Sequence, residues 1–82
     1  MSTGSFAAEV ALRRAVSCLN EKDADLFVGY LHGETEAQLA RRLGYRSEGV
    51  VRLRLNRLRW YVSEAFPGDE DVRDLVTTTH RG

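Results

Sequence analysis

Residues 34–62 read ETEAQLARRLGYRSEGVVRLRLNRLRWYV, and two patterns overlap in this stretch. Seven arginines fall between Arg41 and Arg59, while leucines and valines recur at the three- and four-residue spacing of an α-helix. Gly44 and Ser47 divide the stretch into a short segment and a long one. We therefore expect two amphipathic helices that are joined by a short turn and carry basic outer faces.

The ends of both helices are marked by residues that satisfy free backbone groups. Thr35 and Gln38 have the spacing of a capping box, in which each side chain pairs with the other's backbone donor. Gly44 is placed to end the first helix, and Ser47 is placed to cap the second. A helix between Thr35 and Gly44 would be about nine residues long, too short to persist alone, so it must pack on its neighbours.

The long helix also has one apolar face. Its apolar stripe, directed at the core, consists of Val51, Leu55, Leu58 and Val62. Two more helices are expected upstream, over residues 6–19 with Ser5 as the cap, and over residues 24–33 with Gly33 at the end. No strand pattern appears, so we expect an all-α domain of about four helices over residues 6–66.

Short segments flank this domain. Residues 1–5 are expected to be a flexible N-terminus, and residues 67–82 an acidic C-terminal tail that could add one helical turn between 69 and 76. The tail is either a solubilising end or a segment that folds toward the arginines and competes with DNA. In the second case its removal would tighten DNA binding. The residues that would compete are Asp69, Glu70, Asp71 and Asp74.

The net charge of zero conceals a strong asymmetry. Residues 41–59 carry seven arginines and one acid, giving +6, whereas residues 1–40 carry three basic and six acidic groups, giving −3. Residues 60–82 carry two basic and five acidic groups and also come to −3. A basic block on a pair of capped helices favours nucleic-acid phosphate as the partner. The alternative is a solvated helix face in a chain whose arginine bias reflects a GC-rich genome.

Other classes of function lack the residues that they need. The single cysteine, Cys18, excludes an internal disulfide and fits a reducing, cytoplasmic setting. Cys18 and two distant histidines, His32 and His80, do not make a zinc site. No apolar run approaches the ~20 residues of a membrane span, and no signal-peptide pattern is present. With no phosphate loop or nucleophile–base set, we expect no enzyme, no cofactor and no metal.

A short capped helix, a turn and a longer basic helix together make a helix-turn-helix arrangement. The second helix of such a pair fits the major groove of duplex DNA. Its start is polar, at Ser47 and Glu48, and Gly49 lets the backbone come close. Arg52 and Arg54 are expected to reach outward from it.

In this arrangement, residues 19–62 resemble region 4 of bacterial sigma-70-type RNA polymerase sigma factors, especially the extracytoplasmic-function group. The likeness begins with Tyr30 and Gly33 at the end of a leucine-rich helix and continues with Thr35 as the cap. The further matching residues are Gln38, Leu39, Ala40, Leu43, Gly44, Val51, Arg52, Arg54, Leu55 and Arg57. The sequence departs from the family at Gly29, where a basic residue is common, and at Leu53, where a small polar residue is usual.

The resemblance implies a DNA-binding transcription regulator that reads a −35-like promoter element in double-stranded DNA and contacts the flap of the RNA polymerase β subunit. It implies that Arg57 contacts a phosphate. The other residues that it places against DNA are Gln38, Arg41, Arg42, Ser47, Glu48, Arg52 and Arg54. We expect a cytoplasmic, nucleoid-associated protein that is a monomer or a weak homodimer.

The alternative function is a protein-interaction module with little DNA binding of its own. Its partner would be the β flap, or a sigma or anti-sigma factor. Leu53 and Trp60, seven residues apart on the side of the helix away from the main stripe, are the expected partner-binding residues. For Trp60 and Tyr61, core packing of at least one is the favoured alternative. Sigma factors also need a region that grips the polymerase core and melts the −10 element. Residues 1–82 contain nothing like it, so we expect a free-standing regulator or a piece of a longer factor.

Overall fold

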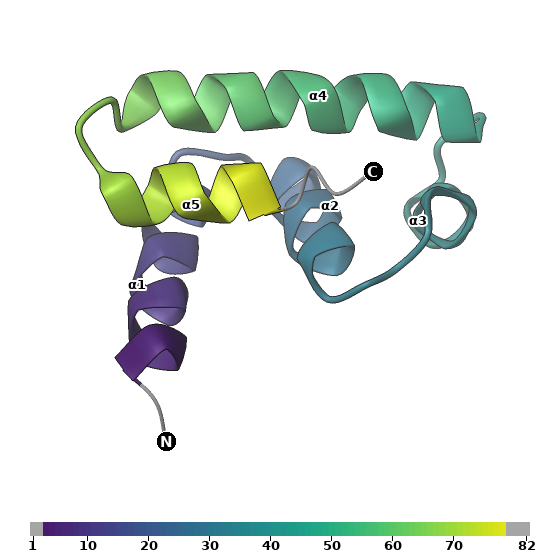
Figure 1. Ribbon diagram of the computed structural model, residues 1–82. Coiled ribbons are helices and arrows are strands. Elements are labelled where there is room, and N and C mark those ends of the chain that lie inside the picture. The colour runs from purple at the N-terminus through teal and green to yellow at the C-terminus, as the bar shows by residue number, and fades with distance from the viewer. Residues whose placement is uncertain (1–2, 79–82) are drawn as a thin grey trace.

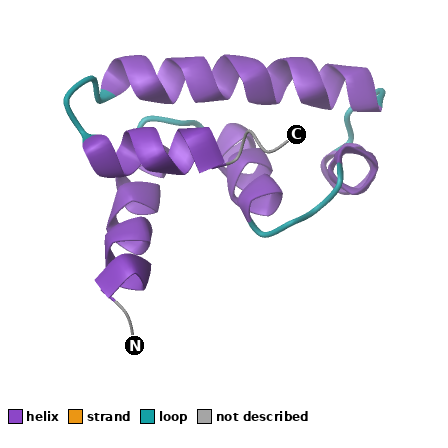
Figure 2. Ribbon diagram, in the orientation of Figure 1, coloured by secondary structure: helices purple, strands orange, loops and turns teal. Residues whose placement is uncertain are grey.

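The computed structural model describes residues 3–78, and within this range the chain is all-helical with no strand (Figures 1 and 2). Side chains are described for residues 9–77. The all-α class predicted from the sequence is confirmed, with five helices over residues 3–78 where about four were expected. The helices are α1 (Thr3–Ser17), α2 (Glu21–Leu31), α3 (Glu36–Leu43), α4 (Glu48–Ala65) and α5 (Glu70–Thr78).

The predicted caps of α3 and α4 are confirmed. The hydroxyl oxygen of Thr35 accepts from the backbone N–H of Gln38 at 3.1 Å, and Oε1 of Gln38 accepts from the N–H of Thr35 at 2.9 Å. Gly44 ends α3 in the left-handed conformation with φ of 79°, where a side chain would be strained. The hydroxyl oxygen of Ser47 accepts from the N–H of Val50 at 3.3 Å and caps α4.

Two helix starts differ from the sequence-based expectation. α2 begins at Glu21 because Oδ1 of Asn20 accepts from the N–H of Asp23 at 2.8 Å, so Asn20 is the cap. α1 begins at Thr3, so Ser5 lies inside the helix and residues 3–5 are helical instead of a flexible end. Apolar spacing marks where the packed face of a helix begins, and it does not fix the first backbone turn.

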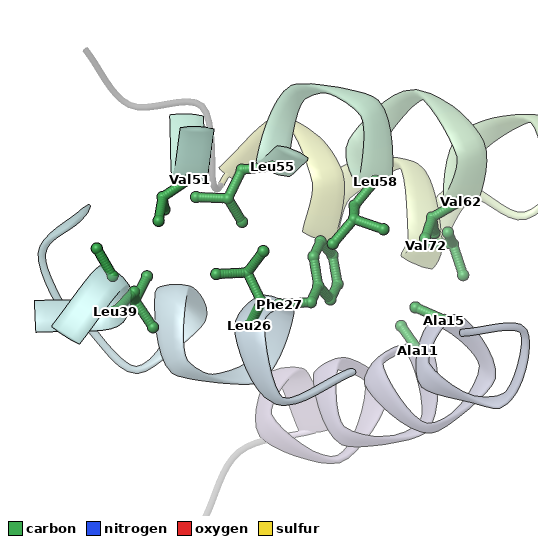
Figure 3. Close-up of a cluster of buried hydrophobic side chains, with 11 residues drawn as sticks. Ala11, Ala15, Leu26, Phe27, Leu39, Val51, Leu55, Leu58, Val62 and Val72 are labelled. Atoms are coloured by element: carbon green, nitrogen blue, oxygen red, sulfur yellow. The ribbon is translucent and has the colours of Figure 1, made fainter. Parts of the chain in front are cut away.

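The core lies beneath α4 and receives side chains from all five helices of the described chain. Figure 3 shows the predicted stripe of α4 directed at Leu26 and Phe27 of α2, which are both fully buried. Leu39 of α3 and the small residues Ala11 and Ala15 of α1 close the two ends of this cluster. The stripe residues, Val51, Leu55, Leu58 and Val62, are all buried.

The segment after Pro67 belongs to the same core. Val72 of α5 is fully buried, and α5 packs against α1 and α4 (Figure 1). The carboxylate of Asp69 accepts from the N–H of Val72 at 3.1 Å and pairs with the guanidinium of Arg14 on α1. These two contacts hold the pKa of Asp69 below its usual range. A domain boundary at residue 66 therefore does not fit the structure, since removal of α5 would open the core.

Asp69 also bears on the expectation that the acidic tail competes with DNA. This carboxylate is engaged with Arg14 and does not reach the arginine block of residues 41–59. Figure 1 places α3 under the first turns of α4, whereas α1 and the start of α5 lie toward the other end of α4. The first arginines of the block, which are on α3, thus lie at the end of the molecule away from α1.

Replacement of Val72 by alanine tests whether α5 is part of the core. Val72→Ala removes two buried methyl groups, so we expect the free energy of unfolding to fall by about 2 kcal/mol. Asp74→Ala, at an exposed position of the same helix, should change it by less than about 0.5 kcal/mol. Urea unfolding followed by circular dichroism measures both values, and equal effects would contradict the packing of α5.

Candidate nucleic-acid interface

The short connection between α3 and α4 is anchored to the rest of the fold. The N–H of Tyr45 donates to the carbonyl of Ala40 at 2.8 Å, which continues the end of α3 into the turn. The Nζ atom of Lys22 on α2 lies 4.5 Å from the centre of the Tyr45 ring, a cation–π contact. Burial, with the nearby carboxylate of Asp23, raises the pKa of the Tyr45 hydroxyl. The turn is thus held against the first turn of α2.

The buried stripe of α4 determines which of its residues face water. Each residue of a helix advances by about 100°, so Gly49, Leu53, Asn56 and Trp60 lie on the side away from the stripe. All four of these residues are exposed. We call them the outward face of α4. This face is the surface that α4 can offer to a partner without unpacking the core.

Arg52 and Arg54 lie on opposite flanks of α4, not together on its outward face. Nη2 of Arg52 donates to Oε1 of Glu36 on α3 at 2.8 Å, and Nε of Arg52 donates to the same oxygen at 3.2 Å. Nε of Arg54 donates to Oδ1 of Asp23 on α2 at 3.2 Å. Two residues apart, the side chains diverge by about 200° around the helix, so both are exposed but they point in different directions.

The Arg52–Glu36 pair joins the two helices of the candidate interface. The side chain of Arg52 is 64% exposed, whereas that of Glu36 is only 25% exposed. The hydrogen bond to Glu36 raises the pKa of the Arg52 guanidinium above its usual value. The contact spans 16 residues of sequence, and no local pattern in the sequence indicates it.

A second pair fastens Arg42 across the end of α2. Nε of Arg42 donates to Oε2 of Glu34 at 2.9 Å, and Nη2 donates to Oε1, so the contact is bidentate. This contact lowers the pKa of Glu34 and raises that of Arg42. A Cβ atom at Gly29 would lie 2.7 Å from Nη2 of Arg42 and 2.8 Å from Cδ2 of Leu39. The glycine that departs from the family pattern therefore makes room for this pair.

The remaining residues predicted to face DNA have mixed surroundings. Gln38 and Ser47 are exposed, but a side-chain oxygen of each accepts a backbone hydrogen bond at the start of a helix. Glu48 is exposed in the first turn of α4. Arg41 and Arg57 are exposed and form no ion pair with any residue in the described range 3–78.

Sequence reasoning missed three residues of this surface. Arg46, in the turn, is exposed and forms no ion pair within the part of the chain that the structure describes. Asn56 is on the outward face, where its Oδ1 accepts from Nη2 of Arg59 at 2.6 Å. Glu36 holds Arg52. The positions of Arg46 and Asn56 in the basic stretch were visible in the sequence, whereas the role of Glu36 depends on tertiary packing.

An apolar surface adjoins the basic one. Among residues 9–77, the exposed large hydrophobic side chains all lie on α4, with Leu53 at 56% and Trp60 at 67% exposure, besides Val50 and Tyr61. A groove of about 660 Å³ runs between this part of α4 and the α1–α2 connection. The residues that line it are Cys18, Leu19, Asn20, Asp23, Arg54, Asn56, Arg57, Leu58, Trp60 and Tyr61.

The described residues include no cluster of metal ligands and no thiol with a lowered pKa. Across residues 3–78 no three His, Cys, Asp or Glu side chains come together as a metal site, and His80 lies outside the described residues. The thiol of Cys18 donates to the carbonyl of Ala15 at 3.1 Å, and burial raises its pKa. Within the same range, no helix combines the length and apolar character needed to cross a membrane.

Comparison of the chain with protein-family models, with curated proteins and with solved structures found no match.

The Glu34–Arg42 pair predicts a pH-dependent stability. Because the pKa of Glu34 is lowered in the folded state, the pair stabilises the fold above the ordinary carboxyl pKa and loses this effect as pH falls through the folded pKa. Glu34→Gln should therefore lower the Tm at pH 7, and the difference between the two proteins should begin to shrink once the pH falls below the ordinary carboxyl pKa of about 4. The difference will be small, since the pair is solvent-exposed.

Thermal melts of the parent, Glu34→Gln and Glu9→Gln between pH 7 and pH 3 measure this effect. Glu9, exposed on α1, controls for the change of net charge. A Tm difference for Glu34→Gln that persists unchanged at acid pH would contradict the pairing.

Proposed function

We propose that this chain is a DNA-binding transcription regulator whose α3–α4 pair acts as a sigma region 4-like helix-turn-helix on duplex DNA. The observation that supports this proposal is the position of the arginine block. Its seven members lie on α3, on the turn and on α4, and six of the seven are exposed. The capped start of α4, where free backbone N–H groups favour an anion, lies in the middle of this block.

The N-terminal part of the outward face of α4, from Gly49 to Asn56, would enter the major groove, which is about 12 Å wide and admits one helix. Gly49 offers close approach, because a Cβ atom there would meet nothing nearer than the hydroxyl of Ser47 at 3.7 Å. Leu53 can contact the methyl group of thymine, and Asn56 can pair with adenine. Arg52, beside this face, supplies the charged base contact.

Four of the other arginines fall into two groups under this proposal. Arg41, Arg46 and Arg57, which form no ion pair within residues 3–78, bind phosphates and set the register of the protein on the duplex. Arg54, tied to Asp23, fastens α4 to α2 and contacts no base.

Replacement of single arginines tests this division. Arg41→Ala and Arg57→Ala should each weaken binding to all sequences alike and reduce the slope of log K against log salt concentration by about 0.9. Fluorescence anisotropy with a labelled duplex of random sequence, at several salt concentrations, measures both quantities. Arg13→Ala, which removes an exposed positive charge from α1, is the matched control. An equal loss in that control would contradict a localised interface.

A second candidate function has its own observation. Leu53, Trp60 and the groove beside Arg54 and Arg57 form an apolar surface with a basic rim. Apolar surface of this kind marks protein interaction sites. Its partner would carry acidic residues around an apolar anchor. The candidates are the polymerase β flap, a sigma factor or an anti-sigma factor.

Single substitutions distinguish the two candidate functions. Under the DNA-binding proposal, Arg52→Glu abolishes binding to duplex DNA, whereas Trp60→Ser leaves it within about twofold, because Trp60 lies about 10 Å beyond Leu53 along α4. Loss of DNA binding in Trp60→Ser would favour the second candidate. The second candidate would also be favoured if the parent binds the β flap but no DNA, and if Leu53→Ser and Trp60→Ser lose the flap interaction. Binding to duplex DNA and to the purified β subunit measures these outcomes.

A further inference from the structure

The contact between Arg52 and Glu36 occupies only one edge of the guanidinium group. Nε and Nη2 of Arg52 both donate to Oε1 of Glu36, and Nε also lies 3.3 Å from Oε2. A guanidinium has five N–H donors in a fixed plane. The two donors of Nη1 and the second donor of Nη2 therefore stay available, on a side chain that is 64% exposed.

The free donors have the geometry of a base contact. The outer N–H groups of Nη1 and Nη2 point in parallel, away from the edge that Glu36 holds. The O6 and N7 atoms of guanine present two acceptors side by side in the major groove, and a bidentate arginine is the commonest specific partner for them. One guanidinium can therefore bind a carboxylate on its side edge and a guanine on its end edge at once.

Glu36 is well placed to act as a support for this contact. It is the first residue of α3, inside the capping box that Thr35 and Gln38 form, and only a quarter of its side chain is exposed. A long arginine side chain in water loses rotamer freedom when it binds. A side chain that is already fixed loses less of that freedom on binding, and its fork is presented in one orientation.

We propose that Glu36 is a positioning residue that presets Arg52 to read a guanine in the major groove. This inference rests on the proposed DNA binding of the α3–α4 pair and adds the base that it reads. Glu36 itself contacts no DNA. Its effect is on discrimination between bases at one position and not on the number of phosphate contacts.

Different results are expected if Glu36 instead opposes DNA binding. A carboxylate that merely competes with phosphate for Arg52 would hold the arginine away from DNA. Its neutralisation would then tighten binding to every sequence and add about 0.9 to the magnitude of the salt slope. A presetting carboxylate leaves that slope unchanged and affects one base position.

The test is a selection of bound duplexes from a random library, followed by Kd measurements on the enriched sequence and on its single-base variants. The parent should enrich a motif with one guanine whose replacement costs about 5- to 150-fold in Kd. Glu36→Gln should reduce that discrimination to a few-fold, with the salt slope unchanged. Arg52→Lys should abolish it and keep the slope, since lysine keeps the charge and lacks the fork. Glu9→Gln, with the same change in charge on α1, should match the parent.

The outcomes that overturn the inference differ from those that overturn the proposed function. The inference is refuted, while DNA binding stands, if Glu36→Gln discriminates at the guanine as well as the parent does, or if no guanine of the motif depends on Arg52. It is also refuted if Glu36→Gln binds DNA more tightly and with a steeper salt slope. A parent that binds no duplex refutes the proposed function and the inference with it. Melting curves of each variant establish that the fold is retained.

Discussion

The apolar stripe of α4 on Leu26 and Phe27 is the contact on which the rest of the structure depends. Because an α-helix fixes the angle between its side chains, burial of one stripe decides the direction of every other residue of α4. Leu53 and Asn56 must then face water, and Arg52 and Arg54 must fall on opposite flanks. The same stripe receives α3 at one end and α5 at the other.

This constraint explains how a chain of zero net charge can present a basic surface. Three acids of the N-terminal half, Asp23, Glu34 and Glu36, each hold one arginine of the basic block. Asp69 holds Arg14 at the other end of the molecule. The pairs fix three arginines of the block in place, whereas Arg41, Arg46 and Arg57 form no ion pair within residues 3–78, and no neighbouring carboxylate compensates their charge. Overall neutrality therefore says little about the local field at α3 and α4.

Local signals in the sequence predicted the fold well where the physics is local. The capping box of Thr35 and Gln38, the left-handed Gly44 and the apolar stripe of α4 each depend on residues within a few turns of one another. The place of α5 was not visible in this way. Its packing depends on Val72 meeting α1 and α4, which are distant in sequence.

The candidate site was predictable in its extent but not in its internal order. The arginine block and its helices were visible in the sequence, whereas core packing was expected for at least one of Trp60 and Tyr61, which are both exposed. The partners of Arg52 and Arg54 lie 16 and 31 residues away, and no spacing rule connects them. The sequence placed both arginines in one role, whereas in the structure they pair with carboxylates of different helices.

A titration of the ¹⁵N-labelled chain with a 20-base-pair duplex, followed by amide chemical shifts, locates the surface that binds DNA. We expect the shifts to concentrate between residues 35 and 59, with the largest at Gly49, Arg52 and Asn56, and α1 and α5 to stay unchanged. Shifts centred on Leu19 and Trp60 beside the groove, or no shifts at about 150 mM salt, would contradict the docking of the N-terminal part of α4 on duplex DNA.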